Sequence, residues 1–192
     1  MLLPIKKQQL ERNSFADNSA KFSSRYFGDH QPVVAFFIVF EIVLVEPEIP
    51  HNAGAAGRLA VATGSRLHLI KPLGFSLDEK AVRRAGLDYW REVNLVVWDD
   101  WTKFNSQTWK GNRWMLTTKG SASIWDAEFS PGDLLIFGAE TRGLSTEIRS
   151  SVAEEACLRI PMSEGPIRSL NLSTSIAIVL YEACRQNPAP FA

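Results

Sequence analysis

The residues best suited to chemistry stand in four polar stretches, each of which follows a short apolar run. The stretches are 46–58, 117–120, 138–143 and 161–173. A polar loop held between two buried elements is a common form of binding or catalytic loop, because the rigid elements fix its side chains. The last stretch is the most informative, and its polar residues include Ser163, Glu164, Arg168, Ser169 and Asn171.

The first stretch ends in Arg58 and reads Asn-Ala-Gly-Ala-Ala-Gly-Arg over 52–58. It is predicted to open a helix, and a helix N-terminus offers free backbone N–H groups to an anion. Arg58 would add a permanent cation whose forked donors suit a phosphate or a developing oxyanion. A plainer interpretation stays open, in which Gly54 and Gly57 allow close helix packing and Arg58 is solvated.

The third stretch reads Gly-Ala-Glu-Thr-Arg-Gly over 138–143, with glycine at both ends. It lacks the spacing of a dinucleotide fingerprint, and the sequence contains no Gly-x-x-x-x-Gly-Lys-Ser/Thr phosphate loop. Such a turn lets the backbone approach a ligand closely. Composition alone favours a solvated turn in which Glu140 and Arg142 pair with each other, but the position directly after a buried strand weakens that interpretation.

The histidines and cysteines of the regular region indicate neither a metal site nor a nucleophile. His51 and His68 lack neighbours at metal-ligand spacing, and His68 falls inside a predicted strand, where a structural histidine is expected. Cys157 and Cys184 lie in apolar elements and are expected to be buried thiols of a reducing compartment. No metal is predicted.

The charge balance argues against a general polyanion binder. Lys plus Arg and Asp plus Glu each number 21 among 192 residues, so the formal net charge is zero. A local basic face is compatible with this balance. The aromatic residues Phe75, Tyr89 and Trp90 lie among basic ones, a mixture that suits RNA and an ordinary surface equally. The apolar run 33–45 is too short for a membrane span of roughly 20 residues and too far along for a signal peptide, so we expect a soluble, cytoplasmic protein.

Short apolar strands alternate with helices, which predicts an α/β fold with a parallel sheet and helices on both faces. The predicted strands are 36–45, 67–70, 95–98, 114–118, 133–137 and 156–160. The predicted helices are 53–63, 78–84, 145–152 and a long one capped by Ser169 or Asn171. Ligands of such sheets bind outside the carboxyl ends of the strands, so the last three polar stretches are predicted to converge on one pocket.

A single domain is predicted over 37–187. Residues 1–36 are mixed and polar without a sustained period, which is typical of a flexible tail. Residues 188–192 are predicted to form a short C-terminal tail.

Three stretches, taken in order, resemble the three motifs of the SpoU branch of the SPOUT methyltransferases. They are 46–58, then 137–144, then 160–162 together with 169–173. The stretches Leu-Thr-Thr-Lys-Gly at 116–120 and Arg-Arg-Ala-Gly-Leu-Asp-Tyr at 83–89 make the chain similar to the TrmL/YibK type of tRNA (cytidine/uridine-2′-O-)methyltransferase. The resemblance runs from about Glu41 to Arg185, nearly the whole regular region.

The resemblance implies a particular fold and cofactor. The fold would be the SPOUT fold, a parallel α/β sheet whose C-terminal segment forms a deep trefoil knot, a feature nearly absent from other proteins. The cofactor would be S-adenosylmethionine, held by the knot loops. The residues implied to line its pocket are Leu116, Gly138, Ile160, Met162, Ser169 and Leu170. The protein would be a homodimer, with the site completed across the interface.

The implied reaction is methyl transfer to the ribose 2′-hydroxyl of the wobble nucleotide, cytidine or uridine 34, in the anticodon stem-loop of tRNA. The resemblance assigns catalysis to Arg58, assisted by Asn171, with Glu140 orienting the site. A cation near the hydroxyl would stabilise the negative charge that develops on its oxygen. Three alternatives stay open: a non-catalytic knotted RNA-binding protein, a 2′-O-methyltransferase of another RNA, and a small-molecule-binding α/β protein.

The chain departs from the family pattern around the cofactor loop. Ile167 stands where the family has a small polar residue, and the loop 163–168 is one residue longer. Ala139 replaces a frequent proline in the second motif. These differences bear on the shape of the cofactor loop.

Overall fold

The structure is a computed structural model that describes residues 39–77 and 88–188. The predicted tail 1–36 and the predicted helix 78–84 lie outside the described residues, as do positions 189–192 of the predicted C-terminal tail. The described residues all belong to one compact unit.

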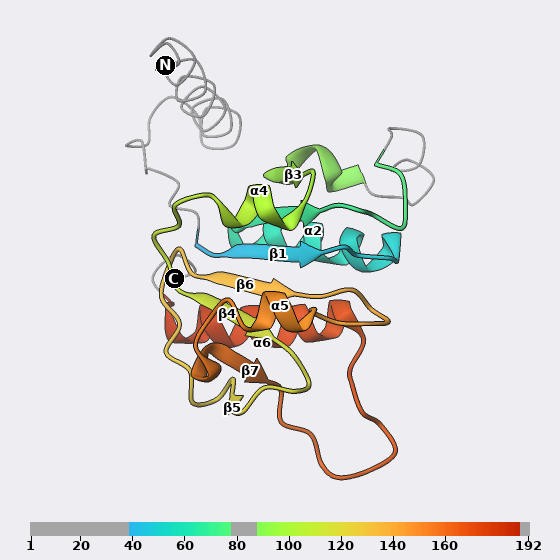
Figure 1. Cartoon of the computed structure of the whole chain (residues 1–192). Coiled ribbons are helices and arrows are strands. Elements are labelled where there is room, and N and C mark those ends of the chain that lie inside the picture. The colour runs from blue at the N-terminus through green and yellow to red at the C-terminus, as the bar shows by residue number, and fades with distance from the viewer. Residues whose placement is uncertain (1–38, 78–87, 189–192) are drawn as a thin grey trace, which may run out of the picture. The chain divides into compact units, whose positions relative to one another are not determined.

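The sheet has seven strands in the order β3-β2-β1-β6-β4-β7-β5, and neighbouring strands pair in parallel (Figure 1). The strands are β1 (Glu41–Val45), β2 (Arg66–Ile70), β3 (Leu95–Trp98), β4 (Arg113–Leu116), β5 (Ala122–Ser123), β6 (Leu134–Phe137) and β7 (Cys157–Arg159). The parallel sheet predicted from alternating strands and helices is therefore confirmed.

Helices cover both faces of this sheet (Figure 1). One face packs against α2 (Pro50–Thr63) and α6 (Leu172–Gln186), and the other against α4 (Trp101–Asn105) and α5 (Thr146–Arg149). Successive side chains of a strand point to opposite faces. Ile42 and Leu44 of β1 accordingly join the core with α2 and α6, and Val43 and Val45 join the core with α4 and α5. Burial on both sides explains why these strands are continuous apolar runs.

Several elements differ in extent from the prediction. The strand predicted at 114–118 is Arg113–Leu116, the strand predicted at 156–160 is Cys157–Arg159, and the helix predicted at 145–152 is Thr146–Arg149. The short elements α4, β5, η1 (Asp88–Glu92) and η2 (Glu154–Ala156) were not predicted. Segments of two to five residues are too short to show a hydrophobic period, so the sequence pattern carries little signal for them.

The long helix α6 is capped by Asn171, one of the two residues predicted for this role. The Oδ1 atom of Asn171 accepts a hydrogen bond of 2.8 Å from the backbone N–H of Ser173. Ile176, Val179 and Leu180 are fully buried on its inner side. None of the helices in the described part of the chain is long and apolar enough to cross a membrane.

His68 is a structural histidine, as its place in a strand predicted. Its ring is buried, and its Nδ1 atom accepts a hydrogen bond of 2.9 Å from the indole N–H of Trp98. The proton of the neutral ring is therefore on Nε2, which donates to the carboxylate of Glu41 at 2.8 Å. Burial lowers the pKa of His68 and thereby favours this neutral form. The same contact accounts for Glu41, the one charged residue in the apolar run of β1.

β7 lies between β4 and β5, two strands that follow one another in the sequence. Leu158 of β7 pairs with Leu116 on one side and with Ala122 on the other. The connecting residues 117–121 therefore pass across one face of β7. A Cβ atom added at Gly120 would lie 2.5 Å from the carbonyl oxygen of Cys157, so only glycine allows this close crossing.

Candidate active site

The first and third polar stretches lock together through the carboxylate of Glu140. Its Oε2 atom accepts a hydrogen bond of 2.7 Å from the backbone N–H of Glu48. Its Oε1 atom accepts bonds from the backbone N–H of Ile49 at 3.2 Å and from Nδ2 of Asn52 at 2.8 Å. Glu140 follows β6 and these three donors follow β1, so the carboxyl ends of two neighbouring strands are joined.

Glu140 also compensates for a helix that lacks a cap of its own. The N-cap position of α2 is Ile49, whose side chain makes no capping hydrogen bond. The positive end of a helix dipole is stabilised by a nearby carboxylate. Glu140 supplies that carboxylate from another strand, and so it holds the start of the helix that carries Arg58.

The ionisation of Glu140 follows from the same contacts. Burial raises the pKa of the carboxyl, but the hydrogen bonds from Asn52 and from the backbone N–H groups of Glu48 and Ile49 outweigh it. The net result is a lowered pKa, and Glu140 is a carboxylate at neutral pH. Its predicted role of orienting the site fits this geometry.

Arg142 and Thr141 add a second set of contacts to the same junction. Arg142 forms an ion pair with Glu46, and Thr141 donates from its hydroxyl to Glu48 at 2.8 Å. The interpretation in which Glu140 and Arg142 pair with each other is therefore wrong. Both side chains reach instead to the stretch that follows β1, because the turn 138–143 folds against it.

Gly138 and Gly143 shape that turn. A Cβ atom added at Gly138 would lie 2.2 Å from the backbone of Gly143 and Leu144, and Gly143 has a φ of +65°. Gly143 donates its backbone N–H to the carbonyl of Ala139 at 2.8 Å. Gly138 was predicted to line the cofactor pocket, but in the structure it is buried and its space is filled by the turn itself.

Arg58 projects from α2 and lies over an aromatic ring. Its guanidinium carbon is 4.4 Å from the centre of the Tyr89 ring, within the range of a cation–π contact. The first stretch was predicted either to bind an anion through Arg58 or to use its glycines for close helix packing. Close packing is observed at Gly57, since a Cβ there would lie 2.7 Å from the Trp90 ring. Arg58 is exposed but not merely solvated. Tyr89 was noted in the sequence only as an aromatic residue among basic ones.

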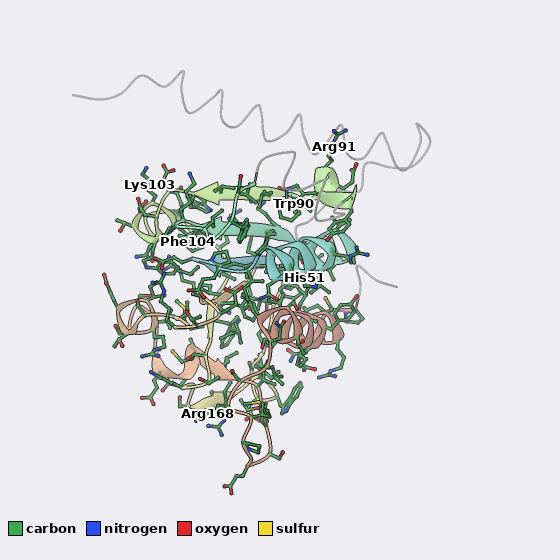
Figure 2. All side chains as sticks on the ribbon, turned by 90° about the vertical axis from the view of Figure 1, so that its right-hand side faces the viewer. His51, Trp90, Arg91, Lys103, Phe104 and Arg168 are labelled. Carbon is green, nitrogen blue, oxygen red and sulfur yellow. The ribbon has the colours of Figure 1, made fainter. Side chains whose placement is uncertain are left out.

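The fourth stretch forms the rim of a cavity of about 230 Å³. The lining residues are Thr118, Arg159, Ile160, Met162, Ser163, Glu164, Gly165, Ile167 and Arg168. Every residue from 161 to 169 is exposed. In Figure 1 this loop swings away from the sheet between β7 and α6, and Figure 2 shows Arg168 on it, far from Trp90.

The structure brings together only part of the predicted cofactor set. Ile160 and Met162 line the cavity, whereas Leu116, Gly138, Ser169 and Leu170 do not. Asn171 is the cap of α6, and its Oδ1 atom also accepts from the Ser173 hydroxyl at 2.6 Å. No hydrogen bond joins Asn171 to Arg58 or to Glu140 within the described residues. The predicted convergence of the last three polar stretches on one pocket is thus seen for the second and the fourth, because Thr118 lines the same cavity as the residues of the fourth stretch. The third stretch contacts the first instead.

In the part of the chain that the structure describes, the cysteines and the metal-binding residue types form no second reactive centre. Cys157 and Cys184 are buried, as predicted, and burial raises the pKa of both thiols, that of Cys184 to about 11. Neither is a thiolate near neutral pH. Within residues 39–77 and 88–188, no group of three or more His, Cys, Asp or Glu side chains could hold a metal ion.

A parallel sheet covered on both faces, with polar loops at the carboxyl ends of its strands, is the architecture of an α/β ligand-binding protein or enzyme. The sequence identifies a narrower class of protein than this architecture does. The model of the SpoU rRNA Methylase family matches residues 39–181, and the chain belongs to this family. The resemblance noted in the sequence is therefore confirmed.

Two relatives share about half of their aligned residues with this chain. A tRNA (cytidine(34)-2′-O)-methyltransferase of Polaromonas sp. (strain JS666 / ATCC BAA-500) is 49% identical over 151 residues, which are 78% of this chain and 92% of that relative. The protein of the same name from Methylovorus glucosotrophus (strain SIP3-4) is 49% identical over 149 residues, 78% of this chain and 96% of its own length.

Solved structures agree in fold. A structure described as giving insights into the 2-OH methylation of C/U34 on tRNA has a TM-score of 0.71 and 42% identity, covering 78% of this chain and 97% of its own. The SpoU methyltransferase AviRb from Streptomyces viridochromogenes, in complex with AdoMet, has a TM-score of 0.67 and 24% identity, covering 78% of this chain and 58% of its own. The second likeness concerns the fold alone.

Proposed function

We propose that this protein is an S-adenosylmethionine-dependent tRNA 2′-O-ribose methyltransferase that acts on the wobble nucleotide, cytidine or uridine 34, of the anticodon loop. The observation that carries the proposal is the 49% identity to the Polaromonas tRNA (cytidine(34)-2′-O)-methyltransferase across 92% of that relative. The preformed junction around Glu140, which holds the helix of Arg58, supports it.

The chemistry assigns distinct tasks to the residues of the site. Transfer would form a bond between the 2′-hydroxyl oxygen and the methyl carbon and break the bond from that carbon to the sulfonium sulfur, which leaves as a neutral thioether. The hydroxyl proton would pass to solvent, so negative charge develops on the oxygen during transfer. Arg58 places a permanent cation where this charge can be stabilised. The Oδ1 atom of Asn171 is engaged in the α6 cap, which leaves the amide N–H groups of Asn171 to bind the substrate. Glu140 acts through α2 and does not itself react.

The cavity suits the proposed cofactor in its chemistry. When bound, S-adenosylmethionine supplies a methyl group on a positively charged sulfur. Ile160, Met162 and Ile167 offer apolar surface to its adenine ring, and Glu164 and Arg168 offer opposite charges to its amino-acid end. We further propose that the loop 161–170, whose residues 161–169 are exposed, moves onto the cofactor and brings Ser169 and Leu170 to it.

Three further features belong to the same proposal. The passage of 117–121 across β7 supports a C-terminal trefoil knot. The exposed apolar side chains Ile49, Val61 and Tyr181 on or beside α2 and α6 support a homodimer through these helices, which would add a second copy's residues to the site. A tRNA substrate supports a cytoplasmic location.

The decisive measurement is methyl transfer from labelled S-adenosylmethionine to unfractionated tRNA, followed by identification of the labelled nucleotide. We expect the label on the ribose of nucleotide 34. Label on another nucleotide or another RNA would overturn the assigned substrate and keep the reaction. Cofactor binding by calorimetry without transfer to any RNA would favour the non-catalytic binding protein.

A further inference from the structure

Two adjacent aromatic residues of η1 dock on α2 through its glycines. The hydroxyl of Tyr89 donates a hydrogen bond of 2.8 Å to the backbone carbonyl of Gly54. The ring of Trp90 packs where Gly57 has no side chain, at a spacing of 2.7 Å from the position a Cβ would take. Figure 2 shows Trp90 beside α2. Both contacts fix η1, and with it the plane of the Tyr89 ring, relative to the helix.

The guanidinium of Arg58 lies over the face of this fixed ring. Arg58 stands four residues after Gly54, so the residue that anchors the Tyr89 hydroxyl and the residue that stacks on its ring lie on the same side of α2. The guanidinium carbon lies 4.4 Å from the ring centre, within the range of a cation–π contact. Arg58 is thereby restrained in direction, although it is exposed to solvent.

Arg58 differs from two other arginines of the protein in the kind of group that it contacts. Arg142 and Arg185 are paired with the carboxylates of Glu46 and Glu182, which occupy N–H donors and compensate the charge. The face of an aromatic ring does neither, because it carries no formal negative charge and no oxygen acceptor for the guanidinium N–H groups. Arg58 therefore keeps both its charge and its donors for an anionic ligand.

We propose that Tyr89 is a positioning residue for methyl transfer, whose ring holds the guanidinium of Arg58 in the direction of the substrate hydroxyl. The inference rests on the role assigned to Arg58 in the proposed function. It predicts that the aromatic ring is needed more than the hydroxyl, since the ring contacts Arg58 and the hydroxyl only anchors the ring.

The test compares Tyr89→Leu, which removes the ring, with Tyr89→Phe, which keeps it and loses only the hydrogen bond to Gly54. We expect Tyr89→Leu to lower kcat by roughly 3- to 30-fold, the range that corresponds to loss of a cation–π contact, with the Kd for S-adenosylmethionine unchanged. Tyr89→Phe should recover most of kcat even where its thermal stability falls. Equal losses of kcat in the two variants would overturn the proposal, because they would indicate a purely structural role.

A second measurement separates failure of this inference from failure of the proposed function. In an Arg58→Ala background, Tyr89→Leu should reduce methyl transfer no further. If it reduces transfer equally in both backgrounds, Tyr89 does not act through Arg58 and the inference is wrong. If Arg58→Ala alone leaves transfer intact, the role of Arg58 is wrong instead.

A spectroscopic readout needs no catalysis at all. The side-chain protons of Arg58 should show an upfield ring-current shift in nuclear magnetic resonance spectra of the wild-type protein and of Tyr89→Phe. The shift should vanish in Tyr89→Leu. An unshifted Arg58 signal in the wild-type protein would show that the two groups do not stack in solution and would refute the inference.

Discussion

At the start of α2 the carboxylate of Glu140 accepts three hydrogen bonds, whereas every residue of the segment 161–169 is exposed. The first region joins two strand ends through charged and backbone groups within hydrogen-bonding distance. The second has no regular structure and carries Ile167 with 64% of its surface exposed. Both regions belong to the same proposed site.

The difference indicates a site with one preformed half and one half that depends on a ligand. The Glu140 junction holds the helix of Arg58 without help from any bound molecule. An exposed loop with few contacts has a low free energy of opening and is suited to close over a ligand. We therefore expect catalytic geometry to depend on the junction and cofactor affinity to depend on the loop.

The largest effect is expected for Arg58→Ala. It should lower methyl transfer roughly 10²- to 10³-fold, the loss seen when one group that stabilises an oxyanion is removed. The affinity for S-adenosylmethionine should not change, because Arg58 lies outside the cavity. Transfer assays measure the loss of activity, and calorimetry measures the affinity for S-adenosylmethionine. Lys103→Ala, which removes an exposed cation from α4 on the other face of the sheet, is the control and should transfer normally.

Limited digestion with trypsin compares the accessibility of the loop and of the junction in a single reaction. Trypsin cleaves after Arg168 in the loop and after Arg142 in the junction. With S-adenosylmethionine at 100 times its Kd, about 1% of the protein stays free, so cleavage after Arg168 should slow up to roughly 100-fold. Cleavage after Arg142 should change little, because the junction is formed before the cofactor binds. Mass spectrometry of the fragments gives both rates. Equal protection at the two sites would contradict the division of the site into two halves.

Glu140→Gln should weaken the junction. The new amide places N–H donors against the N–H groups of Glu48, Ile49 and Asn52, and the free energy of unfolding should fall by about 1–3 kcal/mol. Thermal unfolding at neutral pH measures this loss. Glu147→Gln, at an exposed site on α5, should leave the melting temperature unchanged.

The difference in stability between the wild-type protein and Glu140→Gln should depend on pH in a defined direction. Because the pKa of Glu140 is lowered in the folded protein, its stabilisation is present above the pKa of the unfolded chain and is lost as pH falls through the folded value. The stability gap between wild type and Glu140→Gln should therefore shrink as pH falls below about 4. A gap that stays constant down to pH 3 would mean that the carboxylate form is not what stabilises the junction.

The smallest effect is expected for the cap of α6. Asn171→Ala should cost about 1 kcal/mol of stability, and Asn171→Asp should restore it, since aspartate is an equally good cap. Methyl transfer should stay low in Asn171→Asp if the amide N–H groups bind the substrate. Recovery of both properties in Asn171→Asp would show that Asn171 serves only as a cap.

The sequence predicted the sheet and its order of strands and helices well, because Ile42–Val45 and Leu134–Phe137 are continuous apolar runs buried on both faces. It also pointed to Arg58, Glu140 and Asn171. It did not predict what these residues contact: Glu140 is separated by 92 positions from Glu48, and no local pattern indicates such a pairing. The contact of Arg58 with Tyr89 was missed for the same reason, although the Gly-x-x-Gly-Arg spacing that permits it was visible.

The pairing of β1 with β6 has a consequence for synthesis on the ribosome. Glu41 pairs with Leu134, so β1, an interior strand of the sheet, receives its second neighbour only after roughly 90 further residues, about 5–20 s at ordinary rates of elongation. Until then β1, β2 and β3 form a partial sheet with the apolar edge of β1 uncovered. An uncovered edge strand is a template for pairing with other chains. The yield of folded protein is therefore expected to depend on how fast the ribosome passes from β1 to β6 and on whether a chaperone covers that edge in the interval.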